Sequence, residues 1–253
     1  MLKKKKNNKS YPTNNLEQLL EELKLRFIKE NYYETALQCA KEKTCFVEFL
    51  DQLIQGEHAL RRDRFIERRI KAAKFPVVKT LEQFNWDWPK KSPEQTIKAL
   101  AHFEFIKQHT NVILVGSVGL GKSHLAIALG YMACLARYSV MFTTAVEMVH
   151  NLVAATHAGS LKRELKRYKK PDLLILDELG YLPLDKHGGD LLFQVVSQRY
   201  ETGSIIVTTN RVYKHWPEIF NNDATLTSAL LDRLLHHSET ITLTGKSYRT
   251  VHQ

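Results

Sequence analysis

The sequence predicts an α/β protein with a parallel, doubly wound sheet, preceded by a small all-α domain. After Pro93, apolar runs such as 173–176 alternate with helical stretches of ten or more residues. That alternation is typical of parallel strands buried on both faces and joined by helical crossovers. From Leu16 to Lys74 no proline interrupts apolar residues at helical spacing, so this earlier stretch is expected to be helical throughout.

Shifts in composition divide the chain into four expected parts. Residues 1–12 are polar and lysine-rich, which predicts a disordered arm. A helical domain is expected over 13–75, a linker marked by prolines and tryptophans over 76–95, and the α/β domain over 96–253. The expected strands are Asn111–Gly116, Ser139–Thr143, Leu173–Asp177, Ser204–Thr209 and Thr240–Thr244.

The composition narrows the class of protein. Of 253 residues, 43% are hydrophobic and 25% are charged, which predicts a packed globular core. No apolar run approaches the roughly 18 residues that a bilayer requires, and the lysine-rich start lacks the apolar stretch of a secretory signal. The three cysteines lack metal-ligand spacing and are typical of reduced core residues. We therefore expect a cytoplasmic protein with no membrane partner.

An apolar strand, a glycine-rich loop and a helix follow one another from residue 111 and predict a nucleotide site. The loop 116–123 reads Gly-Ser-Val-Gly-Leu-Gly-Lys-Ser, the spacing of an ATP-binding P-loop. Its glycines let successive backbone N–H groups converge on phosphate oxygens at a helix N-terminus. Lys122 supplies a full charge to the β- and γ-phosphates, and the Ser123 hydroxyl can bind Mg²⁺. The expected ATP-binding residues of this loop are Gly116, Ser117, Val118, Gly119, Leu120, Gly121, Lys122, Ser123 and His124.

Polar side chains stand at the ends of two further expected strands. Asp177 and Glu178 follow the apolar run 173–176, and Asn210 follows the strand 204–209. Because ligands of such sheets bind at the carboxyl ends of the strands, all three are expected at the nucleotide. Asp177 would hold Mg²⁺ through water, Glu178 would orient or deprotonate the attacking water, and Asn210 would bond the γ-phosphate or that water. The second carboxylate favours hydrolysis over a plain nucleotide-binding switch.

Four segments together carry a family resemblance. They read Gly-Leu-Gly-Lys-Ser-His-Leu-Ala (119–126), Asp-Glu-Leu-Gly-Tyr-Leu-Pro (177–183), Leu-Leu-Asp-Arg-Leu-Leu-His-His-Ser (230–238) and Gly-Lys-Ser-Tyr-Arg (245–249). In this order they resemble the AAA+ ATPases, in the branch of the DnaC, DnaI and DnaA loaders and initiators. More closely still, the chain resembles IstB, the helper ATPase encoded beside the transposase in two-gene insertion sequences. The similarity extends from about residue 15 to the C-terminus.

This resemblance implies a function and two further site residues. An IstB-like protein would form an ATP-dependent homo-oligomer on double-stranded DNA and remodel that DNA. It would assist the transposase of the same element in target selection and insertion. Its ATP sites would lie between subunits, with Arg233 as the arginine finger that a neighbour contributes. Arg249 would be a second nucleotide-sensing arginine, and no C-terminal lid domain is expected around it.

Two basic tracts are candidates for DNA binding, in keeping with the formal net charge of +10. Lys162, Lys166 and Lys170 are four residues apart and share one helix face, with Arg163 and Arg167 beside them. In the initiator and loader relatives, the corresponding insertion contacts nucleic acid. The second tract contains Arg61, Arg62, Arg68 and Arg69. Either tract could instead be a solvated helix face, and the second could bind the transposase or a neighbouring subunit.

Other interpretations stay open at this point. A replicative helicase loader of DnaC or DnaI type would use the same ATPase core and grip a helicase through its N-terminal helices. A P-loop kinase of small molecules would need an acceptor pocket, which the sequence does not indicate. His236 and His237 are adjacent, and no third metal ligand lies at a useful spacing, so a metal site is not expected. Trp86 and Trp88 are expected either to stack on adenine or to anchor the linker.

Overall fold

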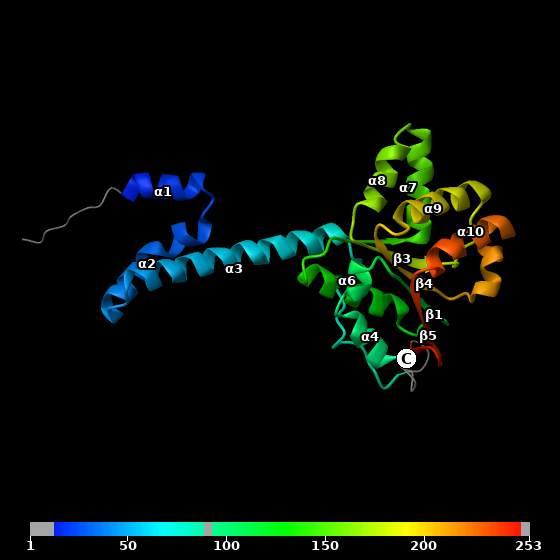
Figure 1. Cartoon of the computed structure of the whole chain (residues 1–253), viewed down its shortest axis with the longest axis horizontal. Coiled ribbons are helices and arrows are strands. Elements are labelled where there is room, and N and C mark those ends of the chain that lie inside the picture. The colour runs from blue at the N-terminus through cyan, green and yellow to red at the C-terminus, as the bar shows by residue number, and fades with distance from the viewer. Residues whose placement is uncertain (1–12, 89–92, 249–253) are drawn as a thin grey trace, which may run out of the picture. The chain divides into compact units, whose positions relative to one another are not determined.

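The computed structural model describes residues 13–88 and 93–248. The expected arm at 1–12, part of the linker (89–92) and Arg249 lie outside these described residues. The chain divides into two compact units between Phe65 and Ile66, and each is described by itself. Figure 1 shows both units and labels their helices and strands where there is room.

The N-terminal unit is helical, as the proline-free apolar spacing predicts. Its helices are α1 (Thr13–Glu22), α2 (Arg26–Glu42) and the long α3 (Phe46–Ala73), inside which the division falls. The buried core of this unit is small and consists of Leu20, Ile28 and Leu53.

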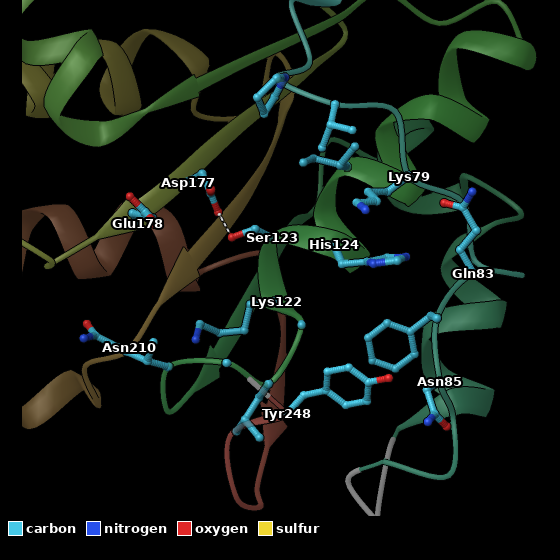
Figure 2. A pocket seen from close by; sticks show the side chains of 18 of the residues that line it. Lys79, Gln83, Asn85, Lys122, Ser123, His124, Asp177, Glu178, Asn210 and Tyr248 are labelled. Carbon is cyan, nitrogen blue, oxygen red and sulfur yellow. Dashed lines mark hydrogen bonds between the residues drawn. The ribbon is translucent and has the colours of Figure 1, made fainter. Parts of the chain in front are cut away.

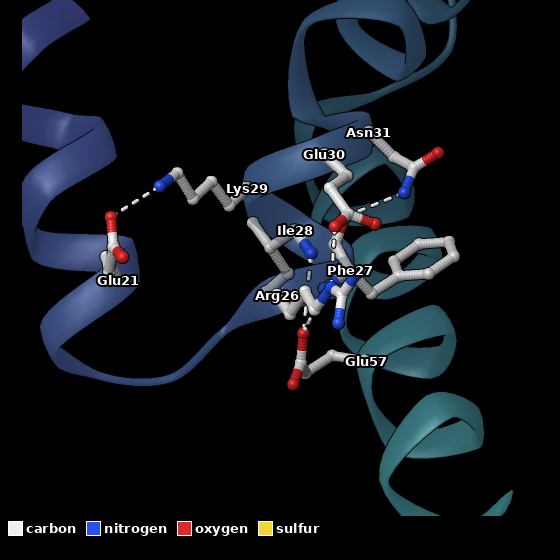
Figure 3. A network of polar contacts seen from close by, with 8 residues as sticks. All are labelled: Glu21, Arg26, Phe27, Ile28, Lys29, Glu30, Asn31 and Glu57. Carbon is white, nitrogen blue, oxygen red and sulfur yellow. Dashed lines mark hydrogen bonds and ion pairs between the residues drawn. The ribbon is translucent and has the colours of Figure 1, made fainter. Parts of the chain in front are cut away.

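A buried carboxylate joins α2 to α3 in this unit. Glu57, only 5% exposed, accepts hydrogen bonds from the backbone N–H groups of Phe27 (2.7 Å) and Ile28 (3.4 Å) at the start of α2 (Figure 3). A carboxylate at this position satisfies orphan N–H donors and complements the helix dipole. Arg61 contacts Glu57 at 2.9 Å and also donates to the carbonyl of Lys24 at 3.2 Å. Arg61, one of the expected DNA contacts, therefore serves the packing of its own unit.

The C-terminal unit contains one parallel sheet with the strand order β2-β3-β4-β1-β5. The strands are β1 (Asn111–Gly116), β2 (Val140–Thr144), β3 (Leu173–Leu179), β4 (Ser204–Thr209) and β5 (Ser238–Leu243). This confirms the predicted fold class. The bounds differ by up to two residues: β5 starts two residues earlier than expected, and β3 continues two residues beyond Asp177, because it bulges there and resumes pairing at Leu179.

Helices cover both faces of this sheet, which is what continuous apolar strands require. Along β1, Val112 and Leu114 belong to one buried cluster, whereas Ile113 and Val115 belong to the other. On the first face lie α4 (Glu94–Leu100), α5 (Glu104–Lys107) and α6 (Lys122–Leu135). The second face is covered by α7 (Ala145–His157), α8 (Leu161–Lys169), α9 (Lys186–Arg199), the 3₁₀ helix η1 (Tyr213–Phe220) and α10 (Ala224–Leu235) (Figure 1).

A buried arginine fixes the segment between α8 and the sheet. Arg199, 1% exposed, lies at the end of α9. Its burial lowers the pKa of the guanidinium to about 10, so the group stays charged at neutral pH. It donates hydrogen bonds to the backbone carbonyls of Tyr168, Lys169, Pro171, Asp172 and Ser204. These bonds join the end of α8 to the starts of β3 and β4.

The cysteines follow the sequence expectation in two cases of three. All three are free thiols; Cys39 and Cys134 are buried, and burial raises the pKa of Cys134 to about 11. Cys45 is exposed, because it lies between α2 and α3 rather than on a packed face, so its assignment to the core was wrong. Within 13–88 and 93–248, no helix is both long and apolar enough to cross a membrane.

Candidate functional site

A cleft of about 1140 Å³ opens at the carboxyl ends of the central strands (Figure 2). The loop after β1 contributes residues 118–124, the end of β3 contributes Asp177 and Glu178, and the residue after β4 contributes Asn210. The structure thus brings together in one cleft the three motifs that the sequence places at three strand ends. Parallel pairing of β1, β4 and β3 is the reason, since it puts these ends side by side.

The loop after β1 has the backbone that a phosphate cradle needs. Gly119 and Gly121 have φ values of +80° and +82°, a region open to glycine and costly for other residues. A Cβ at Gly121 would also collide with the Phe84 ring. Helix α6 then starts at Lys122, and none of the described side chains caps its first turn. Its first N–H groups are therefore available to an anion.

The Lys122 ammonium lies beside this loop. It donates hydrogen bonds to the carbonyls of Gly116 and Ser117, both at 2.8 Å. Those two residues act through their carbonyls, whereas residues 118–124 line the cleft itself. Lys122 can exchange these carbonyls for phosphate oxygens, which are stronger acceptors for an ammonium.

The carboxylate of Asp177 is buried against two hydroxyl groups. Its Oδ1 accepts hydrogen bonds from Ser123 Oγ at 2.8 Å and from Thr208 Oγ1 at 2.5 Å. A hydroxyl and a carboxylate oxygen at this separation are the hard ligands that Mg²⁺ prefers. Glu178 is exposed next to Asp177, and both line the cleft. The residues present therefore fit a magnesium-bound triphosphate with a carboxylate beside it.

Arg233 lies outside the group of residues described as lining this cleft. It projects from α10, with its guanidinium 4.7 Å from the centre of the Phe193 ring and a hydrogen bond to the Ala229 carbonyl at 3.0 Å. Together with Asp232 and small residues of α10 it borders a separate, shallow pocket. None of the α8 basic residues lines the cleft either.

Sequence reasoning missed most of one wall of the cleft. Lys79, Gln83 and Asn85 from the linker lie opposite the P-loop, and Tyr248 closes the lower side (Figure 2). The Tyr248 N–H donates to the Gly119 carbonyl at 3.0 Å. A detectable signal was the aromatic run Phe84, Trp86 and Trp88 in the linker, because large aromatic side chains usually pack against a neighbouring surface.

The linker aromatics and His124 hold this wall in place. Trp86 packs against Phe84, with ring centroids 4.7 Å apart, and contacts the core on the α6 side. The Trp88 indole donates to the Lys246 carbonyl at 3.1 Å and Trp88 lines the cleft. The His124 ring is turned to the linker, 2.8 Å from the Thr80 carbonyl oxygen. Trp86 is thus an anchor, and Trp88 is the tryptophan within reach of a ligand.

The adjacent histidines have a neighbour that the sequence did not reveal. Donor atoms of Glu201, His236 and His237 all lie within 4.8 Å of one another on the exposed surface. Glu201 lies far from both in sequence, and only the fold brings it near. The His236 Nδ1 is also 2.8 Å from the Tyr200 hydroxyl. Spacing in the sequence could not reveal this neighbour, and the expected absence of a metal site stays a prediction.

The IstB-like ATP-binding protein family matches residues 18–253. The chain belongs to this family. It is 40% identical over 234 residues to the IS21 insertion-sequence protein of Pseudomonas aeruginosa that is named for ATP binding, covering 92% of this chain and 88% of that protein. The corresponding IS5376 protein of Geobacillus stearothermophilus is 37% identical over 227 residues, or 90% of each chain. The resemblance to IstB is thereby confirmed.

Solved structures confirm the fold of this IstB-like protein. DnaA from Aquifex aeolicus, solved with AMPPCP, superposes with a TM-score of 0.55 at 23% identity, covering 67% of this chain and 51% of DnaA. The DnaC helicase loader superposes with a TM-score of 0.51 at 20% identity, covering 70% of this chain and 99% of DnaC. The chain spans about half the length of the DnaA structures that it matches. It is an AAA+ P-loop protein of the IstB-like family, an ATP-binding ATPase.

Proposed function

We propose that this IstB-like ATPase assembles on double-stranded DNA in an ATP-dependent manner and assists the transposase of its own insertion sequence. The help would consist of remodelling the DNA, selecting the target and promoting insertion. The cleft described above carries the proposal. Its P-loop, acid pair and Asn210 can bind ATP and activate water, but no arginine finger is among its described lining residues. A neighbouring copy of the chain would supply that arginine. The insertion-sequence origin of the relatives supports the transposase as partner.

The residues of the three motifs have distinct roles in this proposal. Lys122 and the N–H groups of the loop bind the β- and γ-phosphates. Mg²⁺, when bound, would be held by Ser123 and, through water, by Asp177, and it would neutralise phosphate charge. Glu178 is the general base that takes a proton from the attacking water, and Asn210 holds that water or the γ-phosphate. Arg249 remains a proposal from the family resemblance alone.

Arg233 supports a site shared between two copies of the chain. Its place on α10, away from the cleft of its own chain, suits a residue that reaches the nucleotide of a neighbour. A heterologous contact of this kind repeats from copy to copy and generates a ring or a helical filament. The arginine would then stabilise charge on the transferred phosphoryl group in the next subunit.

Mixing two inactive variants tests this arrangement. Arg233→Ala protein and Glu178→Gln protein are each expected to hydrolyse ATP at least about 100-fold more slowly than the wild type. An equal mixture should recover about a quarter of wild-type turnover, because one interface in four then pairs an intact cleft with an intact arginine. Phosphate release measures the outcome. Arg137→Ala, an exposed arginine at the turn after α6, is the matched control. A mixture with no recovered turnover would remove Arg233 from its role in trans.

Helix α8 is the proposed DNA surface. Leu165 and Tyr168 are buried on one side, whereas Lys162, Arg163 and Lys166 are exposed on the other. Lys170, the residue that caps the helix, is exposed as well. The Arg199 bonds described above hold the end of this helix to the sheet. Arg167 pairs with Glu164 at 2.6 Å, so it contributes less free charge. A fixed row of lysines suits binding to phosphates that does not depend on sequence.

The N-terminal arginines are a second proposed DNA surface, in which two members already contact carboxylates of their own chain. Arg61 is bonded within its own unit, and Arg62 lies 3.2 Å from Asp63. Arg68 and Arg69 belong to the C-terminal part of α3, which lies beyond the division. Of the two tracts, α8 therefore offers the better case for direct contact with DNA.

Removing two charges from α8 tests the DNA surface. Lys162→Gln/Lys166→Gln protein is expected to bind double-stranded DNA more weakly, with the slope of log K against log salt reduced by up to about 2. Fluorescence anisotropy at several salt concentrations measures both. Lys98→Gln/Lys107→Gln protein is the control, because these lysines are also exposed but pair with Glu94 and Glu104. Equal slopes for the two variants would rule out α8 as the DNA surface.

A pull-down with this protein tests the partner. Recovery of a helicase but no transposase would favour the helicase-loader function.

A further inference from the structure

The end of β3 does not pair regularly with β4. Leu176 lies opposite Val207 and Leu179 lies opposite Thr209. Three steps along β3 therefore match two steps along β4, which is the geometry of a β-bulge. Asp177 and Glu178 are the two residues of the bulge, and Thr208 is the single residue opposite them. Bulges of this type redirect side chains next to active sites.

Glu178 has an unusual backbone conformation in this bulge. Its φ is +60°, in the left-handed region that side-chain-bearing residues rarely occupy. Such conformations persist where neighbouring groups hold them. The bulge keeps Leu179 buried at 1% exposure while Glu178 stays exposed at the cleft. Side chains of a regular strand point alternately to its two faces. If the pairing of this segment shifted by one residue, Glu178 would point to the face where Leu179 now lies.

One hydroxyl bonds to both residues of the bulge. Thr208, itself 1% exposed, accepts a hydrogen bond from the Glu178 N–H at 2.9 Å. The same Oγ1 donates its proton to Asp177 Oδ1 at 2.5 Å. Asp177 in turn accepts from Ser123, as Figure 2 shows. Thr208 thus connects the backbone of Glu178 to the carboxylate that faces the P-loop serine.

We propose that Thr208 is a positioning residue for ATP hydrolysis, which holds Glu178 where it can accept a proton from water. The inference rests on the proposed role of Glu178 as general base. Thr208 does not touch the nucleotide or the water in this mechanism. It acts through the bulge, by keeping the Glu178 backbone in the left-handed conformation. A displacement of about 1 Å in a catalytic group can lower a rate by about 100-fold.

Removing the hydroxyl should separate turnover from binding. Thr208→Val protein keeps the shape of the side chain, and we expect its kcat to fall by about 10- to 100-fold. Its affinity for ATP should change by less than about threefold, because the P-loop is untouched. Thr208→Ser protein restores the hydroxyl and should restore most of kcat. Steady-state phosphate release and titration with a fluorescent ATP analogue give the two quantities.

A double-mutant cycle identifies the residue through which Thr208 acts. In Glu178→Gln protein the base is already absent, so adding Thr208→Val should change the single-turnover rate by less than about twofold. A loss as large as in the wild-type background would show that Thr208 acts through Asp177 or overall stability, and would overturn the inference. Normal turnover of Glu178→Gln protein would overturn the role of Glu178 instead, so the two failures are distinguishable.

The matched control is the Thr143→Val variant. Thr143 is also a buried threonine, 2% exposed, and lies on β2. Its hydroxyl bonds to Thr144 and Glu147, not to Asp177 or Glu178. We expect it to keep wild-type kcat. If Thr208→Val protein does not purify in a folded form, Thr208→Ala removes the same hydroxyl and carries the same expectation. A parallel loss of kcat and ATP affinity, or unchanged kcat, would overturn the positioning role.

Discussion

Glu178→Gln protein is expected to bind ATP with nearly wild-type affinity and to hydrolyse it at least about 100-fold more slowly. The amide has the size of the carboxylate but cannot take a proton from water. Binding should be retained because Glu178 is exposed at the rim of the cleft and bonds through its backbone to Thr208, not to the P-loop. Phosphate release gives the rate, and titration with a fluorescent ATP analogue gives the affinity.

The same variant should lengthen the lifetime of ATP-dependent assemblies on DNA, since ATP that is not hydrolysed keeps the protein in its nucleotide-bound state. Glu239→Gln, an exposed glutamate of β5, is the control and should behave as wild type. Wild-type turnover in Glu178→Gln protein would mean that another group activates the water. Weakened ATP binding would mean that Glu178 helps to hold the nucleotide.

Lys122→Ala protein is expected to lose measurable ATP binding. Bound phosphates would cover the partly buried Lys122 ammonium, and removing one partner of such a covered charge pair costs about 2–5 kcal/mol, which is a loss of roughly 30- to several thousand-fold in affinity. The change also leaves the carbonyls of Gly116 and Ser117 without the bonds that Lys122 now supplies. Isothermal titration with ATP and Mg²⁺ measures the effect, and ATP-dependent assembly should disappear with it.

Two controls separate this effect from misfolding. The thermal unfolding midpoint without nucleotide should stay close to that of the wild type, because Lys122 is only partly buried. ATP should raise the midpoint of the wild type but not that of Lys122→Ala protein, since only a ligand that binds the native state stabilises it. Lys98→Ala, an exposed lysine of α4 paired with Glu94, should keep the ATP-dependent increase. A variant that still binds ATP with wild-type affinity would contradict the assignment of the P-loop.

The sequence by itself determined the fold class and the three motifs of the cleft. Continuous apolar runs predicted the parallel sheet. The glycine spacing of residues 116–123 predicted a phosphate-binding loop. Both are local signals, because an apolar run and the backbone freedom of glycine can be recognised within a few consecutive residues. The parallel sheet then required the strand ends that carry Asp177, Glu178 and Asn210 to meet.

Only the tertiary structure decided how those residues are held and what else surrounds them. The bulge that places Glu178 depends on Thr208, which lies 30 residues away on another strand. Arg61 pairs with Glu57 because α2 and α3 pack together. The linker forms a wall of the cleft because Phe84 packs onto Gly121. Residue spacing within one segment can be taken directly from the sequence. A hydrogen bond between distant segments depends on strand register and packing, and no local sequence pattern specifies either of these.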